Sequence, residues 1–141
     1  MKGSYLCKSL LVGLLCLAAC SPSTERGIGE AGSDVLIEKL AEARTLAESA
    51  PLQSSELALD VLAQVELKGN IDLAAAAKLI LCTYTTPPLA IDTTLAFCRE
   101  AMGYYEQYPG RKEQGIVLNS IGILHDIKGE KDLAVQSFEE A

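Results

Sequence analysis

The sequence predicts an all-α fold in which antiparallel helical hairpins stack on one another. From Ser33 onward, apolar residues recur three or four positions apart, which is the spacing of one helix face. No segment of this region shows the strict alternation of apolar and polar residues typical of a half-buried strand. Clusters rich in Pro and Gly divide the region into six helical segments with short connections. Three hairpins stacked as a short solenoid explain this pattern economically.

The first two helices are expected to be bounded by a proline and a glycine. Ser33 or Asp34 caps the first helix, and Pro51 ends it because proline lacks a backbone donor. The second helix is expected to start near Ser54 or Ser55 and to stop at Gly69, a residue type suited to the left-handed position after a helix. The residues expected to face inward are Leu36, Leu40, Ala43, Ala47, Leu57, Ala58, Val61, Leu62 and Val65.

The next two helices are expected to begin at acidic residues and to end at proline clusters. Asp72 begins the third helix, which stops before Pro87-Pro88 because a diproline cannot continue a helix. Asp92 caps the fourth helix, which ends at Pro109-Gly110. The inward-facing residues of this pair are Leu73, Ala76, Ala77, Ile80, Leu81, Tyr84, Leu95, Cys98, Met102 and Tyr105.

The last two helices form the clearest hairpin. The fifth is expected to run from Glu113 to Ile127, and Gly129 separates it from a sixth helix that extends from Glu130 to Ala141. The core face of the fifth helix consists of Val117, Leu118, Ile121 and Leu124.

Residues 1–19 are expected to be a secretory signal. Lys2 and Lys8 both precede an apolar run that begins at Leu10. This run is about half the length of a membrane span. The sequence Leu17-Ala18-Ala19-Cys20 resembles the lipobox of bacterial lipoproteins. This resemblance implies cleavage before Cys20, attachment of a diacylglyceryl group to its sulfur and acylation of its new amino group. An ordinary secretory signal that ends in a cysteine is the alternative.

The residues after the lipobox are expected to form a flexible tether, 20–33, ahead of a helical domain, 34–141. This segment is small, polar and interrupted by Pro and Gly, so it lacks the apolar periodicity of an ordered element. Ser21 occupies the position where an aspartate retains many lipoproteins in the inner membrane. The sorting rules of that family therefore imply an outer-membrane lipoprotein that faces the periplasm.

Two cysteines, Cys82 and Cys98, remain in the predicted helical domain. Both lie on apolar helical faces on either side of one turn, and a small buried hydrophobe is the commoner role of such residues. A disulfide between them is the alternative, because the periplasm permits one. Two thiols and the distant His125 do not complete a four-ligand zinc site, so no metal or other cofactor is expected.

The charge of the chain excludes one class of partner. The full sequence has a net charge of −7, and removal of the signal with Lys2 and Lys8 leaves ten basic against nineteen acidic residues, a net charge of −9. Nucleic-acid binding requires a basic face that displaces counterions. We therefore expect no nucleic-acid partner.

The last hairpin carries a spacing of large and small residues found in a known repeat. Seven of its residues fall at offsets 0, 3, 4, 7, 16, 20 and 23, namely Leu118, Ile121, Gly122, His125, Ala134, Phe138 and Ala141. This spacing resembles the large, Leu, Gly, Tyr, Ala, aromatic and Ala signature of the tetratricopeptide repeat (TPR). His125 in place of Tyr and Lys131 in place of an aromatic depart from that signature.

The resemblance is clear over residues 113–141 and weak upstream, and it implies a right-handed solenoid. In such a repeat Gly122 and Ala134 are small because two helices cross closely there. The residues expected to pack this repeat are Leu118, Ile121, Gly122, Ala134 and Phe138.

The same resemblance implies a function and a binding surface. TPR lipoproteins hold protein segments, and the first helix of each hairpin lines the concave surface. The corresponding positions of the fifth helix are Asn119, Ile123 and Asp126, the expected contacts with a protein or peptide partner. A solvated polar edge is the alternative role of these residues.

No arrangement of residues indicates an enzyme. His125, the one histidine, lies at a repeat-packing position, and Glu139 and Glu140 are adjacent on a helix, so they point in different directions. The sequence therefore predicts a lipid-anchored envelope adaptor. The competing class is a solute- or glycan-binding lipoprotein, in which aromatic side chains stack on a sugar; the candidates are Tyr84, Tyr104, Tyr105 and Tyr108.

The last repeat also predicts that the helical stack continues or is covered at its end. A TPR has 34 residues, and the sequence stops at Ala141, inside the second helix of the repeat. Terminal repeats need a polar outer face, whereas this helix carries Leu133, Val135 and Phe138. We therefore expect a further segment or a partner to cover these side chains.

Overall fold

The computed structural model describes residues 27–83, 89–107 and 112–141, and within these ranges it contains six α-helices and no β-strand. The predicted all-α class is confirmed. The helices are α1 (Gly27–Leu46), α2 (Pro51–Lys68), α3 (Ile71–Thr83), α4 (Ile91–Tyr105), α5 (Lys112–Ile127) and α6 (Lys131–Glu140).

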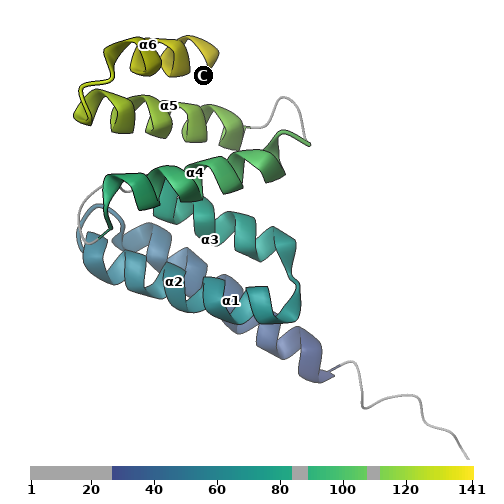
Figure 1. The fold of residues 1–141 in the computed structure, drawn as a ribbon. Coiled ribbons are helices and arrows are strands. Elements are labelled where there is room, and N and C mark those ends of the chain that lie inside the picture. Colours follow the sequence, from purple (N-terminus) through teal and green to yellow (C-terminus); the bar gives the residue numbers. More distant parts are fainter. Residues whose placement is uncertain (1–26, 84–88, 108–111) are drawn as a thin grey trace, which may run out of the picture.

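Each helix packs against the next one along the chain, and the hairpins follow one another from α1 and α2 to α5 and α6 (Figure 1). In addition, α1 contacts α3, and α3 contacts α5. Over the described residues, no Cα atom of α2 lies within 8 Å of one in α4, and none of α4 within 8 Å of one in α6. The helices α1, α3 and α5 therefore form one continuous layer, as in a helical-repeat fold. The right-handed twist that the TPR resemblance implies stays a prediction.

The first helix begins earlier than the sequence predicted. It starts at Gly27, so Ser33 and Asp34 lie inside α1 and not at its cap, and the tether predicted over residues 20–33 is wrong for residues 27–33. The physical reason is that adding residues to an existing helix costs far less free energy than starting one. Glu30 and Ala31 are good helix formers and favour this extension across the intervening glycines.

The second helix also begins earlier than expected, because Pro51 starts it instead of ending α1. A proline is well tolerated at the first helical position, where its missing N–H has no intrahelical partner. Ser54 then lies inside α2, buried, and its Oγ donates a hydrogen bond to the Ala43 carbonyl oxygen of α1 at 2.7 Å. The predicted end is confirmed, since α2 stops at Lys68 and Gly69 adopts a left-handed φ of 68°.

The caps of α3 and α4 differ from the predicted acidic residues. Asn70 caps α3, because its Oδ1 accepts a hydrogen bond from the Leu73 N–H at 3.1 Å. Asp72 and Asp92 lie in the first turns of α3 and α4, where a carboxylate interacts favourably with the helix dipole. The predicted inward residue Tyr84 and the proline clusters 87–88 and 109–110 lie outside the described residues.

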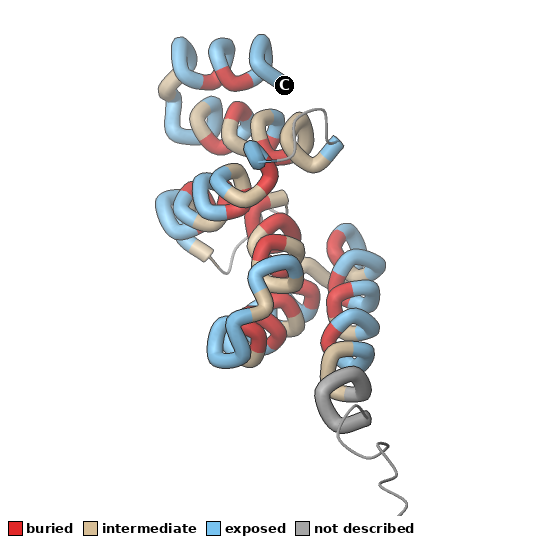
Figure 2. Tube along the Cα trace, turned by 90° about the vertical axis from the view of Figure 1, so that its right-hand side faces the viewer, coloured by how far each residue is buried: buried red, intermediate tan, exposed pale blue. Residues whose placement is uncertain are grey.

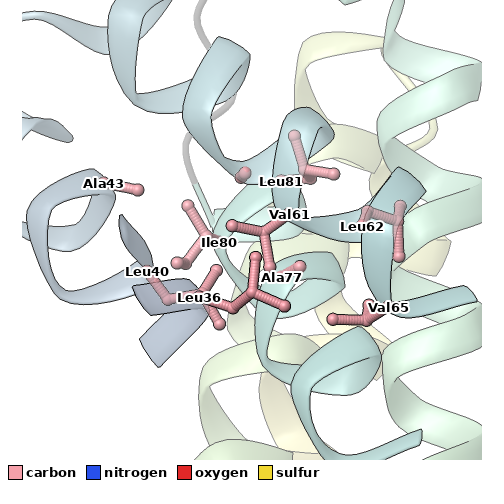
Figure 3. Close-up of a cluster of buried hydrophobic side chains, with 10 residues drawn as sticks. Leu36, Leu40, Ala43, Val61, Leu62, Val65, Ala77, Ile80 and Leu81 are labelled. Atoms are coloured by element: carbon pink, nitrogen blue, oxygen red, sulfur yellow. The ribbon is translucent and has the colours of Figure 1, made fainter. Parts of the chain in front are cut away.

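Two apolar clusters hold the stack together, and buried residues lie where neighbouring helices face one another (Figure 2). Figure 3 shows the first cluster, between α1, α2 and α3. The second joins α3 to α4 and α5. Helix α3 contributes to both, with Ile80 and Leu81 in the first cluster and Leu79 and Cys82 in the second. It is therefore the central helix of the structure.

A disulfide joins Cys82 of α3 to Cys98 of α4. Both residues are fully buried, as the sequence predicted, but the preferred expectation of two separate thiols is wrong. The reason is geometric, because the packing of α3 on α4 brings the two Cα atoms to 4.8 Å, within the range that a disulfide spans. The bridge fixes the central hairpin covalently.

Candidate functional site

The predicted repeat-packing residues meet in the α5–α6 hairpin at Gly122. A Cβ atom on Gly122 would lie 2.5 Å from Phe138 Cε1, so only a glycine allows the ring to lie against α5. Ala134 is buried beside this crossing, whereas Phe138 is 43% exposed. Ile121 packs against the second core cluster, and the half-buried Leu118 lines a depression near the end of α6. The structure thus places these residues together, with Phe138 only half covered.

His125 belongs to a polar network at the α5–α6 turn. Its Nδ1 lies 2.5 Å from Glu130 Oε2, and the Lys128 ammonium contacts Glu130 Oε1 at 3.4 Å and Asp92 Oδ1 at 2.8 Å. The hydrogen bond with His125 lowers the pKa of the Glu130 carboxyl, and Lys128 lowers it further. The network ties the turn to the start of α4, which is a structural role for this histidine.

A groove crosses the layer formed by α1, α3 and α5 and encloses about 280 Å³. Its floor is aliphatic, because Leu79 and Ile80 of α3 lie beneath it at 6% and 3% exposure. All three helices contribute to its walls, and its lining residues are Arg44, Leu79, Ile80, Thr83, Lys112, Glu113 and Ile116. We refer to these seven residues as the layer groove.

The predicted partner-binding residues continue one edge of the layer groove. Asn119, Ile123 and Asp126 are all exposed on α5. They follow Lys112 and Ile116 of the groove at alternating intervals of four and three residues, which keeps all five on one face of the helix. The exposed Ile123 therefore extends the apolar lining along α5.

Two cations at the layer groove have no acidic partner among the residues that the structure describes. Lys39, Lys78 and Lys128 each form an ion pair with a neighbouring carboxylate. Arg44 of α1 and Lys112 of α5 are exposed and form no ion pair with any residue that the structure describes. Their charges are therefore available to a ligand in the groove.

Sequence reasoning missed Arg44, Lys112 and the groove residues of α3. These side chains are far apart along the chain, and only the contacts of α3 with α1 and α5 bring them together. The TPR resemblance implies that the first helix of each hairpin lines the concave surface, and this signal also applies to the faces of α1 and α3 that carry Arg44 and the floor residues. Lys112 lies on α5 itself, on the face of Asn119, Ile123 and Asp126, and the helical spacing along that face was the signal for it.

A second, larger depression of about 720 Å³ lies at the far end of the stack. Residues from the end of α4, the start of α5 and the end of α6 line it, including Met102, Leu118 and Glu140. Neither α1 nor α3 contributes to it. The layer groove is the better candidate for a binding surface because it connects all three hairpins.

The tyrosines considered for glycan binding have structural roles where they are described. Tyr104 donates a hydrogen bond from its hydroxyl to Asp72, which joins α4 to α3. Tyr105 is buried in the second cluster, and the two rings meet edge to face at 5.0 Å. Tyr84 and Tyr108 lie outside the described residues. A stacking platform for a sugar is not formed by Tyr104 and Tyr105.

Comparison with known proteins does not identify a family for this chain. No protein-family model matches the chain, and no curated protein or solved structure is significantly similar to it. The TPR assignment therefore stays a prediction that rests on the residues of the last hairpin. Among the residues that the structure describes, no three His, Cys, Asp or Glu side chains gather as metal ligands, and no helix there has the length and apolarity to span a membrane.

Proposed function

We propose that this protein is a lipid-anchored envelope adaptor whose layer groove binds a segment of another protein. The observation that carries the proposal is the groove itself, which crosses α1, α3 and α5 and continues along the exposed face of α5. A segment lying across three hairpins would contact each of them, which is how stacked helical repeats use their extended surfaces.

The tight packing of α3, which forms the floor of the layer groove, favours this role. Two apolar clusters and the Cys82–Cys98 disulfide hold α3 against its neighbours. A preorganised surface avoids part of the entropy cost of ordering side chains on binding. The layer groove is thus suited to binding a partner without rearrangement of the core.

The anchoring part of the proposal rests on Cys20 and the lipobox before it. Lipidation at Cys20 would attach the chain through more than one acyl chain, which makes membrane association effectively permanent. Ser21 at the sorting position supports the outer membrane, with the helical stack in the periplasm.

A capture experiment with groove variants tests the binding role. The tagged full chain is solubilised with its envelope partners and compared with Thr83→Trp, which fills the groove, and with Glu56→Trp on the exposed face of α2. We expect a protein retained by the parent and by Glu56→Trp to be lost from Thr83→Trp. Equal retention of the protein by all three would contradict binding of a partner in the layer groove. Retention of a soluble glycan that is lost from Thr83→Trp, with no protein retained, would favour the glycan-binding class.

A further inference from the structure

We infer that the layer groove selects an acidic, extended peptide segment, with carboxylates against Arg44 and Lys112 and an aliphatic side chain on the floor between them. This inference rests on the proposed function and adds the chemistry of the partner. It follows from the charges at the groove, from its apolar floor and from its size.

The charge of the residues that line the layer groove is opposite in sign to the net charge of the whole chain. The chain has a net charge of −7, yet the lining of the layer groove contains two cations and one carboxylate, Glu113. Lys112 is the first residue of α5, so its ammonium adds to the partial positive charge of that helix end. Because Arg44 and Lys112 form no ion pair with the described residues, a ligand carboxylate would not have to displace an existing partner. The local charge is therefore complementary to an acidic segment.

The floor of the groove calls for an apolar side chain. Leu79 and Ile80 are almost fully buried, so the aliphatic surface that a ligand can still cover is mainly that of the half-buried Ile116 of α5. Covering this limited apolar surface favours one aliphatic side chain over a polar one. The hydroxyl of Thr83 already donates to the Leu79 carbonyl at 2.6 Å, so its oxygen presents lone pairs as an acceptor for a peptide N–H.

The size of the groove is compatible with one side chain of a peptide. Its volume of about 280 Å³ lies at the lower limit of the range of roughly 300 to 1,000 Å³ typical of small-molecule sites. A side chain with its neighbouring backbone needs only a shallow site of this kind, and the rest of the segment lies along the face of Asn119, Ile123 and Asp126. The strong negative charge of the chain also opposes a nucleic acid in this position.

Peptide binding to the purified full chain in detergent tests the inference. The probes are fluorescent peptides capped at both ends, Gly-Ser-Glu-Leu-Glu-Ser-Gly and the matched Gly-Ser-Lys-Leu-Lys-Ser-Gly. We expect saturable binding of the Glu peptide in fluorescence anisotropy, with an affinity at least about tenfold above that of the Lys peptide, which corresponds to about 1.4 kcal/mol. We also expect added salt to weaken it, because exposed charges are screened.

Charge reversal provides the decisive comparison. The double variant Arg44→Glu, Lys112→Glu should lose the preference for the Glu peptide and bind the Lys peptide more tightly. Lys131→Glu makes the same kind of charge change on exposed α6, outside the groove, and should bind as the parent does. Circular dichroism checks that each variant is folded, and the neutral double variant Arg44→Gln, Lys112→Gln replaces the charge-reversed one if that variant unfolds.

The inference is overturned if neither peptide binds saturably, if both bind equally well, or if the charge-reversed or neutral double variant leaves the preference for the Glu peptide unchanged. A failure of this kind is separable from a failure of the proposed function. If Thr83→Trp still abolishes capture of an envelope protein, the groove binds a protein whose segment is not acidic. If that capture also fails, the proposed function itself is wrong.

Discussion

At the scale of single residues, the structure explains why glycine and small polar residues occur where helices approach closely. Gly122 admits the Phe138 ring, and buried Ser54 links α2 to the Ala43 carbonyl of α1. The sequence pattern alone predicted the close crossing at Gly122, because a small residue recurs at that position of a known repeat. It did not predict the role of Ser54, since a serine near a helix start is also a typical cap.

Replacing Gly122 with leucine should destabilise the fold. The new side chain would occupy the space of the Phe138 ring. Because this ring is half exposed and can turn outward, we expect a cost of about 1 kcal/mol, at the low end of the range for overpacking. Urea denaturation gives the free energy of unfolding. Gly103→Leu is the matched control, because no atom lies within 4 Å of a Cβ at that exposed α4 position. A Gly122→Leu variant as stable as this control would contradict the packing of the last hairpin.

Ion pairs between helices predict a loss of stability in acid. The hydrogen bond from Lys39 lowers the pKa of Asp60, and the hydrogen bond from Lys128 lowers that of Asp92, both from the ordinary value of 3.8. A lowered folded-state pKa stabilises the protein above the unfolded-state value, and this contribution is lost as the pH falls through the folded-state pKa. We therefore expect Tm to fall below about pH 4.

The double variant Asp60→Asn, Asp92→Asn isolates these two groups. Its Tm should depend less steeply on pH than that of the parent in thermal melts between about pH 5 and pH 2, because neither amide titrates. Parallel curves for the two proteins would show that these pairs do not contribute.

At the scale of the helices, periodicity predicted their existence and their inward faces, whereas several of their starts required tertiary information. The sequence predicts Pro51 as the end of α1 because proline also terminates helices, but Pro51 occupies the first position of α2. The extension of α1 to Gly27 was hidden by the glycines that precede Ser33. The layer groove was missed for a related reason, because its residues come from three helices and share no local motif.

The central hairpin should depend on its disulfide. The bridge joins residues 16 positions apart, and closing a loop of about 15 residues is worth about 3 kcal/mol. We expect Cys82→Ala, Cys98→Ala to lower the free energy of unfolding by about 2 to 4 kcal/mol in urea. Thiol labelling of the denatured, unreduced parent should modify neither cysteine of this pair. Labelling of both would contradict the bridge.

At the scale of the whole molecule, the proposed lipid anchor at Cys20 lies close along the chain to the layer formed by α1, α3 and α5. Residues 21–26 separate Cys20 from the start of α1. Even a fully extended chain of this length reaches only about 20 Å. With a lipid on Cys20, the helical stack would therefore work close to the membrane surface, which favours a partner in the envelope.

Replacing Cys20 with serine should abolish anchoring. If the predicted lipobox is processed as proposed, the Cys20 thiol accepts the lipid, so Cys20→Ser should lose labelling by a radioactive fatty acid and should appear in the soluble fraction or as unprocessed precursor. Cys7→Ser, inside the predicted signal, is the matched control and should be labelled as the parent is. Normal labelling of Cys20→Ser would contradict the lipoprotein assignment.

Photo-crosslinking in cells tests the central claim most directly, namely that the layer formed by α1, α3 and α5 binds another protein. A photoreactive amino acid replaces Thr83 in the layer groove, or Glu56 on the exposed face of α2 as a control. We expect a discrete adduct with an envelope protein from position 83 and none from position 56. The same adduct from both positions, or no protein adduct from position 83, would contradict it.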